Sequence, residues 1–347
     1  MIGPLGSSVD EALQEPAALD LIPADGRAGV AALARRLPDV MHGFGFELRL
    51  HPARAAVDFY TSIAARGGGR EAWARWAQAA PSARPPEWER VAALARRWDD
   101  PSSPLHDRIE KVFLEFDAPF AAGQPPSVFA RLDSAIGGGD EQWVAAAAAV
   151  DELALVWGGG QRWSAAARAS VEAAFAALPP GGRIVDVAAM LPRGQVAMRL
   201  FVALPSSGLG GYLTALGWTD AEARRQLAAL LQSVLAPCRY LSLQIDAGDG
   251  DRVGPRIGVE VSPSVTADGD TWPAVAERLR RAGLGAPSRL AALGRWPGIG
   301  PPRAIGGRWP SQLVRQLSHV KLVLEPARPI EAKVYLWATR RFAQLGG

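Results

Sequence analysis

The sequence predicts a mixed α/β (α+β) fold in which helices surround a closed antiparallel barrel of about ten strands. Three observations support this prediction. Segments that alternate apolar and polar residues come in pairs, Gly and Pro occupy the turns inside each pair, and helical segments separate one pair from the next. About five such α-β-β-α units repeat at a spacing of roughly 60–75 residues. Ten strands are enough to close a barrel and leave no free edge.

The strands are recognised by period-two alternation. The pairs are FGFELRLH with AVDFYTSI, KVFLEFD with SVFARLD, RIVDVAAML with VAMRLFVAL, RYLSLQID with RIGVEVS, and the two halves of residues 318–342. The turns contain residues that favour tight turns, such as Gly123 in the second pair and Pro326 in the last. Each pair therefore reads as a hairpin.

Helices are predicted where apolar residues recur at three- and four-residue spacing. They cover residues 28–37, 70–78, 87–98, 140–157, 163–177, 208–217, 220–235, 272–283 and 287–294. The alternative arrangement of the same elements is an open α+β sheet, or two separate α+β domains. We expect an N-terminal extension over residues 1–27 and one barrel domain over residues 28–347, because barrels wrapped by helices reach this length as a single domain.

The composition narrows the function classes. The chain has 347 residues, 48% of them hydrophobic and 21% charged, which supports a buried core. The net charge is only +3 and no basic block stands apart, so nucleic-acid binding is not indicated. A single cysteine excludes an intrachain disulfide framework, and the four scattered histidines make no zinc-binding pair.

The N-terminal segment has no positive region followed by an apolar core, so we do not expect a signal peptide. No stretch approaches the roughly 18 apolar residues that a membrane span needs. We therefore expect a soluble cytoplasmic protein.

One face of each predicted strand is apolar and the other carries charged and aromatic side chains. If helices cover the apolar face, the other face lines a polar tunnel, and about ten strands enclose more space than side chains fill. We therefore expect a ligand chamber, although a solvated face of an open sheet is the alternative for each residue. The inner-face residues are Glu47, Arg49, His51, Asp58, Tyr60, Glu115, Asp117, Arg131, Arg199, Phe201, Gln244, Asp246, Arg256, Glu260, Lys321, Lys333, Tyr335 and Trp337.

These residue types fit one chemistry. Lys and Arg from neighbouring strands can clamp a diphosphate, and Tyr hydroxyls add neutral donors. Surrounding the leaving group in this way helps an allylic diphosphate to ionise. Aromatic rings stabilise an allylic cation and exclude water, while an acid within reach takes the proton of the acceptor.

The five-hairpin rhythm over roughly residues 30–342, with HVKL at 319–322 and the Lys-x-Tyr pattern KVY at 333–335, resembles the aromatic prenyltransferase barrel. Members of this family, called ABBA, repeat an α-β-β-α unit around a ten-stranded antiparallel barrel. The resemblance implies that an allylic diphosphate donor, dimethylallyl or longer, is bound by Arg49, Arg131, Arg199, Lys321, Lys333 and Tyr335. It implies that Glu47 or Glu115 handles the acceptor proton. Substrate contacts are assigned to Asp117, Tyr60, Gln244, Glu260 and Trp337.

The inner face departs from the familiar small-molecule members because it is rich in acids. Several carboxylates fit a diphosphate only with Mg²⁺ among them or with a cationic acceptor. Cyanobactin peptide prenyltransferases share the barrel, and some modify peptide side chains, including Arg. We therefore expect a prenyltransferase of natural product biosynthesis whose acceptor is a peptide side chain, Arg included, or an aromatic small molecule. The alternatives are a non-prenylating enzyme on the same barrel and a non-catalytic peptide- or ligand-binding barrel with a charged lumen.

Overall fold

The computed structural model describes residues 4–51, 56–79, 85–121, 123–134, 139–193, 198–235, 238–248, 253–262, 272–304 and 310–342. Its strands are β1 (Gly43–Arg49), β2 (Val57–Ala64), β3 (Ile109–Phe116), β4 (Ser127–Leu132), β5 (Arg183–Ala189), β6 (Met198–Pro205), β7 (Tyr240–Ala247), β8 (Ile257–Val261), β9 (Gly298–Ile299), β10 (Ser311–Leu324) and β11 (Glu331–Phe342).

The strands form a closed antiparallel barrel. Strands β1 to β8 pair in chain order, β8 pairs with β10, β10 pairs with β11, and β11 returns to β1. The ring therefore has ten strands, and the predicted closed barrel is confirmed. The short strand β9, which the alternation does not predict, pairs with β10 beside Val314 and Arg315, outside the ring.

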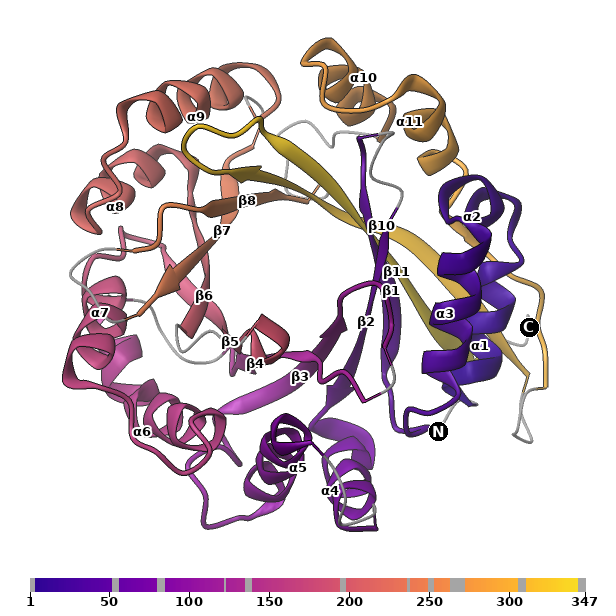
Figure 1. The fold of residues 1–347 in the computed structure, drawn as a ribbon, viewed down its shortest axis with the longest axis horizontal. Helices are drawn as coiled ribbons and strands as arrows, with labels where there is room; N and C mark the ends of the chain where they lie inside the picture. The colour runs from indigo at the N-terminus through magenta and orange to yellow at the C-terminus, as the bar shows by residue number, and fades with distance from the viewer. Residues whose placement is uncertain are drawn as a thin grey trace, which may run out of the picture.

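Helices surround the barrel (Figure 1). Those of the described part are α1 (Leu5–Leu13), α2 (Pro16–Leu21), α3 (Ala24–Ala34), α4 (Gly69–Ala79), α5 (Pro86–Asp99), α6 (Gly139–Trp157), α7 (Ala165–Ala176), α8 (Leu209–Ala215), α9 (Ala221–Ser233), α10 (Trp272–Arg281) and α11 (Pro287–Leu293). None of them is long and apolar enough to cross a membrane.

The hydrophobic core lies between the barrel and the helices. Outward-facing strand residues such as Phe46, Phe59 and Leu114 are fully buried, and they belong to the same cluster as the helix residues Trp73 and Trp98. Because successive strand residues point to opposite faces, burying this face turns the polar face inward. The predicted inner and outer faces are therefore the observed ones.

The two ends of the barrel differ in their connections. The turns inside the five hairpins β1–β2, β3–β4, β5–β6, β7–β8 and β10–β11 all lie at one end, here called the hairpin-turn end. The longer connections that contain helices leave from the other, helix-connection end. Along each strand, residues next to a hairpin turn therefore belong to the first end.

The first helices pack on the C-terminal strand. Arg340 of β11 donates from Nε to Ser8 Oγ (2.8 Å) and forms a buried ion pair with Glu11, both on α1. Helix α1 also packs against α3. The domain boundary predicted between residues 27 and 28 stays a prediction.

Candidate functional site

The barrel encloses a chamber of about 510 Å³. This volume lies within the range of small-molecule binding sites. The chamber lies toward the helix-connection end, since its lining includes His42, Tyr240 and Ser262 at the strand ends there. Tyr240 is 48% exposed, so this side of the chamber reaches solvent.

Four rings form one wall of the chamber. His319 of β10 stacks on Tyr335 of β11 with ring centroids 4.1 Å apart. The ring of Tyr60 meets Tyr335 edge-on at 5.7 Å, and it stacks on Trp337 at 5.7 Å. All four side chains line the chamber. The wall thus offers both ring faces and polar ring atoms to a ligand.

Three phenylalanines line another part of the chamber. Phe129 and Phe201 lie edge to face with centroids 5.3 Å apart. The ring of Phe113 lies 5.0 Å from Arg131 Cζ and 5.6 Å from Lys111 Nζ. Rings on several sides suit a ligand whose reacting carbon becomes cationic.

Glu115 is the acid of the chamber without a partner. Its neighbours across the strands are Tyr60 on β2 and Ser127 on β4, neither of them charged. Within the described residues, no hydrogen bond or ion pair reaches its carboxyl group. Burial raises the pKa of Glu115 to about 8, and the negative charge of Glu47 acts in the same direction. The group can therefore exchange a proton near neutral pH.

The floor of the chamber is a hydrogen-bonded network of Glu47, Lys333, Tyr335, Lys321, Gln244 and Glu260, here called the floor network. Lys333 Nζ and Tyr335 Oη donate to the two carboxylate oxygens of Glu47. Lys321 Nζ donates to Gln244 and lies 3.4 Å from Tyr335 Oη, and the amide of Gln244 donates to Glu260. Every member is buried, so these bonds hold the charged groups in place.

The floor network sets the protonation of its members. Burial alone would raise the pKa of Glu47, but the charges of Lys333 and Lys321, with hydrogen bonds from Lys333 and Tyr335, hold it well below its ordinary value. Burial lowers the pKa of Lys321 to about 8, against the opposing charges of Glu47 and Glu260. Glu47 is therefore ionised and hydrogen-bonded to Lys333 and Tyr335, which makes it a weaker proton acceptor than Glu115.

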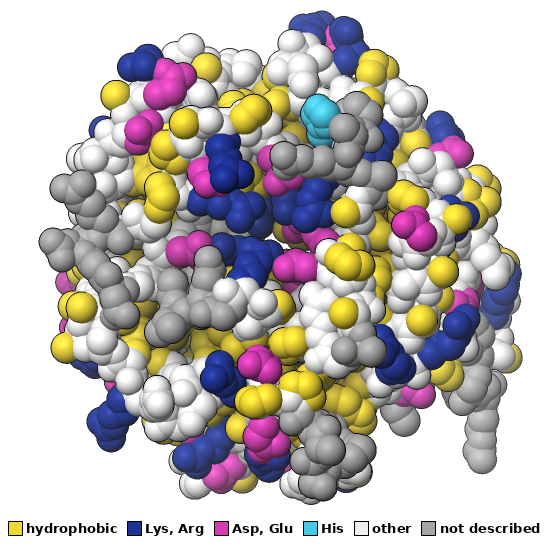
Figure 2. All heavy atoms as spheres, viewed as in Figure 1, with side chains coloured by type: hydrophobic (Ala, Val, Ile, Leu, Met, Phe, Trp, Pro, Cys, Tyr) yellow, Lys and Arg dark blue, Asp and Glu magenta, His cyan; other side chains and the backbone are white. Residues whose placement is uncertain are grey.

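Ion pairs lie on the inner face at the hairpin-turn end. Arg49 pairs with Asp58 (2.9 Å), and Arg199 forms two hydrogen bonds to Asp246 (2.7 and 2.8 Å). Figure 2 looks along the barrel and shows side chains of both charges gathered around its centre. Burial raises the pKa of Asp58 to about 6, and the negative charge of Glu47 adds to the effect.

The sequence-predicted site residues fall into three groups. Those that line the chamber are Tyr60, Glu115, Arg131, Gln244, Glu260, Tyr335 and Trp337. Glu47, Lys321 and Lys333 belong to the floor network, whereas Arg49, Asp117 and Arg199 lie near the hairpin-turn end. Asp117 is not among the chamber-lining residues, because it follows the end of β3 and pairs with Arg193 at 3.1 Å.

Most of the predicted diphosphate ligands are paired with acids. Arg49, Arg131, Arg199 and Lys333 contact Asp58, Asp186, Asp246 and Glu47, respectively. Lys321 instead donates to the neutral Gln244. The roles assigned to all these residues stay predictions.

Several chamber residues are not in the predicted site. Among them are His42, Lys111, Phe113, Phe129, Asp186, Ser242 and His319. The alternation that selects Glu115 also selects Lys111 and Phe113 in the same strand, so these two residues could have been predicted to line the chamber. Among the described residues, no group of three or more His, Cys, Asp or Glu side chains could hold a metal ion.

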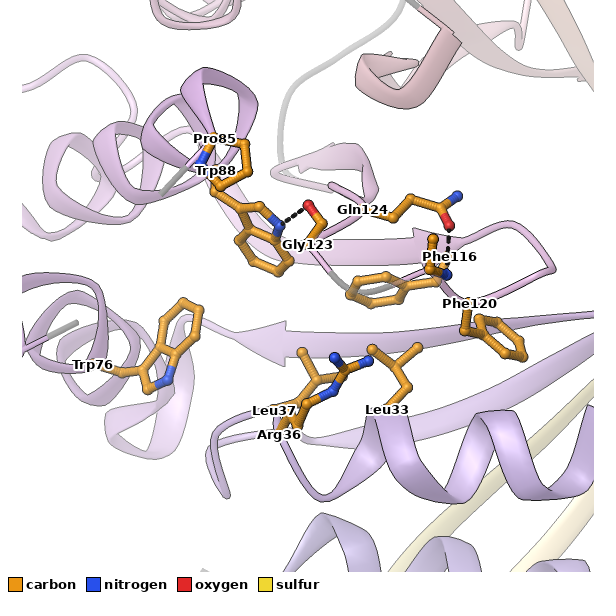
Figure 3. Close-up of a pocket in the computed structure, with 11 residues that line it drawn as sticks. Leu33, Arg36, Leu37, Trp76, Pro85, Trp88, Phe116, Phe120, Gly123 and Gln124 are labelled. Carbon is orange, nitrogen blue, oxygen red and sulfur yellow. Dashed lines mark hydrogen bonds between the residues drawn. The ribbon is translucent and has the colours of Figure 1, made fainter. Parts of the chain in front are cut away.

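A second pocket lies outside the barrel and is separate from the chamber (Figure 3). It has a volume of about 230 Å³ between α3, α5 and the β3–β4 turn, and Trp76, Trp88, Phe116 and Phe120 line it. Trp88 Nε1 donates to the carbonyl of Gly123 at 3.0 Å, which ties α5 to the turn. None of the predicted site residues lines this pocket.

Solved structures similar to this chain come from proteins that share its barrel. No protein-family model and no curated protein matches the chain. The solved structure of PriB in a binary complex with product diphosphate matches at a TM-score of 0.54 and 18% identity, covering 96% of this chain and 95% of that one. The apo form of the prenyltransferase PriB matches at 0.53 and 16%, and a 6-dimethylallyl tryptophan synthase at 0.51 and 16%, each covering 96% and 94% of the two chains.

These matches extend over nearly the whole chain. They confirm the resemblance to the ABBA prenyltransferase barrel at the level of the fold.

Proposed function

We propose that this chain transfers an isoprenyl group from an allylic diphosphate to an acceptor bound in the chamber. One observation carries the proposal: the chamber brings an unpartnered acid, Glu115, together with aromatic walls and a floor that contains Lys321. The fold supports it, since one solved protein with a matching barrel, PriB, is named a prenyltransferase and another is named a 6-dimethylallyl tryptophan synthase. A matching PriB structure holds product diphosphate, the leaving group of such a reaction.

The proposed reaction breaks the bond between the allylic carbon and the diphosphate oxygen. The electron pair leaves with the diphosphate, and the rings of Tyr60, Phe129 and Tyr335 stabilise the allylic cation through their faces. The nucleophilic atom of the acceptor then forms the new bond to the allylic carbon. Its proton passes to the carboxylate of Glu115, which donates it to solvent before the next turnover.

Arg131 and Arg199 can bind a diphosphate while they keep their hydrogen bonds to Asp186 and Asp246. Arg199 donates from Nε and Nη2 to Asp246, and Arg131 uses the same two nitrogens for Asp186. The Nη1 of each guanidinium can then donate a hydrogen bond to a phosphate oxygen. With Lys321 and Lys333, these donors come from β4, β6, β10 and β11 and surround a diphosphate from several sides.

The acceptor class stays as the sequence predicts it: a peptide side chain, Arg included, or an aromatic small molecule. Both present a flat group that the ring walls would contact. The steps proposed here use no metal ion, and the need for Mg²⁺ is left to the experiment.

The first test measures donor binding by thermal unfolding. Dimethylallyl, geranyl and farnesyl thiolodiphosphates keep the anionic head and resist ionisation, and each is added with and without Mg²⁺. We expect a rise of several degrees with one chain length, since ligand at about 100 times its Kd stabilises by about 2.7 kcal/mol. Lys321→Met should abolish the rise, whereas the control Arg225→Met, on the exposed surface of α9, should keep it.

A second step identifies the product. The accepted donor is incubated with indoles, phenols and Arg-containing peptides, and mass spectrometry detects the added isoprenyl unit. Donor binding without any product would favour the non-catalytic binding barrel. No thermal shift with any donor would contradict the proposed function.

A further inference from the structure

The inner face of β1 carries glycine at two positions where a side chain would otherwise enter the lumen. These residues are Gly43 and Gly45, which precede Glu47 and Arg49 on the same face. Neither has a positive φ, so the backbone conformation does not require glycine. Glycine inside a strand weakens it and commonly marks the close approach of another group. The explanation must therefore lie in the space above β1.

Two aromatic rings occupy that space. A Cβ at Gly43 would lie 2.3 Å from Cζ2 of Trp337, and one at Gly45 would lie 2.3 Å from Cζ of Tyr60. Distances below about 3 Å are shorter than any van der Waals contact of carbon. Each ring therefore lies directly against the glycine.

The rings reach β1 from opposite sides. Tyr60 comes from β2 and crosses β1, because its hydroxyl donates to the carbonyl of Leu336 on β11 at 2.8 Å. Trp337 comes from β11, opposite Gly45 in the register. The two rings stack with an interplanar angle of 25°. Tyr60 and Trp337 thus form a stacked pair of rings above β1, here called the platform.

The platform faces the other side of the chamber. In a ring of ten strands β6 lies five strands from β1 in either direction, so Phe201 lies across the lumen from the platform. The free width between them depends on how closely the platform rings approach β1. Any side chain on β1 beneath the rings would move them toward Phe201.

We infer that Gly43 and Gly45 are specificity-determining positions, which fix the width of the space that a flat ring system occupies in the chamber. The inference rests on the proposed function only in taking this ligand to be the prenyl acceptor. The two positions differ in what a methyl group would meet. At Gly43 the contacts are ring atoms of Trp337, which can turn inward, whereas at Gly45 a Cβ would also lie 2.1 Å from the backbone oxygen of Leu336. Gly43→Ala is therefore the cleaner test.

The test titrates the full chain with flat probes of graded size in a calorimeter. Indole has two fused rings and carbazole three, and no diphosphate is present. We expect wild type to bind both probes. Gly43→Ala should bind indole within about threefold of wild type and carbazole at least about tenfold more weakly, since a misfit in a packed pocket has effects of this size.

Two further variants separate this effect from a general disturbance. Gly210→Ala in α8 adds a methyl group that meets nothing within 4 Å, so it should bind both probes like wild type. Gly43→Ala/Trp337→Leu removes the displaced ring and should restore carbazole binding. Trp337→Leu alone, which needs no change at Gly43, should admit the four-ring probe pyrene at least about tenfold better than wild type.

Three results would overturn the inference. They are a wild-type chain that binds neither probe, Gly43→Ala binding carbazole as wild type does, and Trp337→Leu admitting pyrene no better than wild type. A failure of the proposed function would look different. In that case no allylic thiolodiphosphate would shift the melting temperature, while the probe titrations would still distinguish the variants.

Discussion

Charged residues on the inner face of the barrel differ in what the strand register places opposite them. At the hairpin-turn end, Arg199 lies directly opposite Asp246 in the register, and the two charges neutralise each other. Glu115, which also lies next to a hairpin turn, is opposite Tyr60 and Ser127, and no described residue forms a hydrogen bond or ion pair with its carboxyl group. Strand register therefore decides which charges hold the barrel together and which remain available to a ligand.

Paired and unpaired charges should therefore respond differently to mutation. Removing one partner of a buried pair leaves an unpaired charge and should reduce stability. Removing a group without a partner should leave stability nearly intact and change activity alone. The predictions below test this contrast, beginning with the largest expected effect.

Lys333→Met should destabilise the protein most. It leaves Glu47, whose side chain is only 3% exposed, without its ammonium partner. Losing one member of a buried pair costs about 3–5 kcal/mol of unfolding free energy. Chemical denaturation at pH 7 measures the loss. The double variant Lys333→Met/Glu47→Gln should recover at least half of it, and a single variant within about 1 kcal/mol of wild type would contradict the role of the pair.

Glu115→Gln should lower turnover about 100-fold or more, the usual contribution of a general base. Its unfolding free energy and its thermal shift with the donor analogue should match those of wild type, because no residue of the described part is bonded to the carboxyl group. Product formation under saturating donor measures turnover. Unchanged turnover would mean that the acceptor proton goes elsewhere.

The pH dependence of turnover should follow the ionisation of Glu115. Its pKa is raised to about 8, and only the ionised form accepts a proton, so turnover at saturating donor should increase as the pH rises through 8, whereas donor affinity should fall because Lys321, with its pKa lowered to about 8, loses its charge. The ionised fraction grows about tenfold from pH 7 to pH 9. Glu115→Gln should remove this rise, while a rise of the same size in that variant would assign it to another group.

Arg193→Gln should have the smallest effect. Its pair with Asp117 also lies at the hairpin-turn end, but the two side chains are 31% and 23% exposed. Pairs this accessible to water contribute about 0–1 kcal/mol. The unfolding free energy should therefore change by less than about 1 kcal/mol. A loss as large as that of Lys333→Met would show that burial does not separate the two pairs.

The fold could be predicted from the sequence because its signals are local. Alternation in segments such as KVFLEFD identifies a strand and both of its faces, and the rhythm of hairpins and helices gives the strand number. The strand β9 was missed because two residues, Gly298 and Ile299, show no alternation. Its pairing depends on the position of β10, which no local pattern contains.

The candidate site was predictable by residue type but not by partner. The alternation correctly predicts that the side chains of Glu115, Lys321 and Tyr335 point into the barrel. It could not tell that Glu47 is bonded to Lys333, 286 residues away, because that contact depends on register and closure. Gly43 was missed for a simpler reason, since a residue without a side chain leaves no sign of the ring above it.

Barrel closure has a kinetic consequence for folding. Strand β1 pairs with β11, and the hydrogen bond from Tyr335 to Glu47 joins residues 288 positions apart. Contacts between such distant segments form slowly, because the entropy cost of closing a long loop arises before the contacts can stabilise the chain. Until then β1 and β11 remain as two unpaired edges that can bind the strands of other molecules. We therefore expect aggregation during refolding to rise with protein concentration.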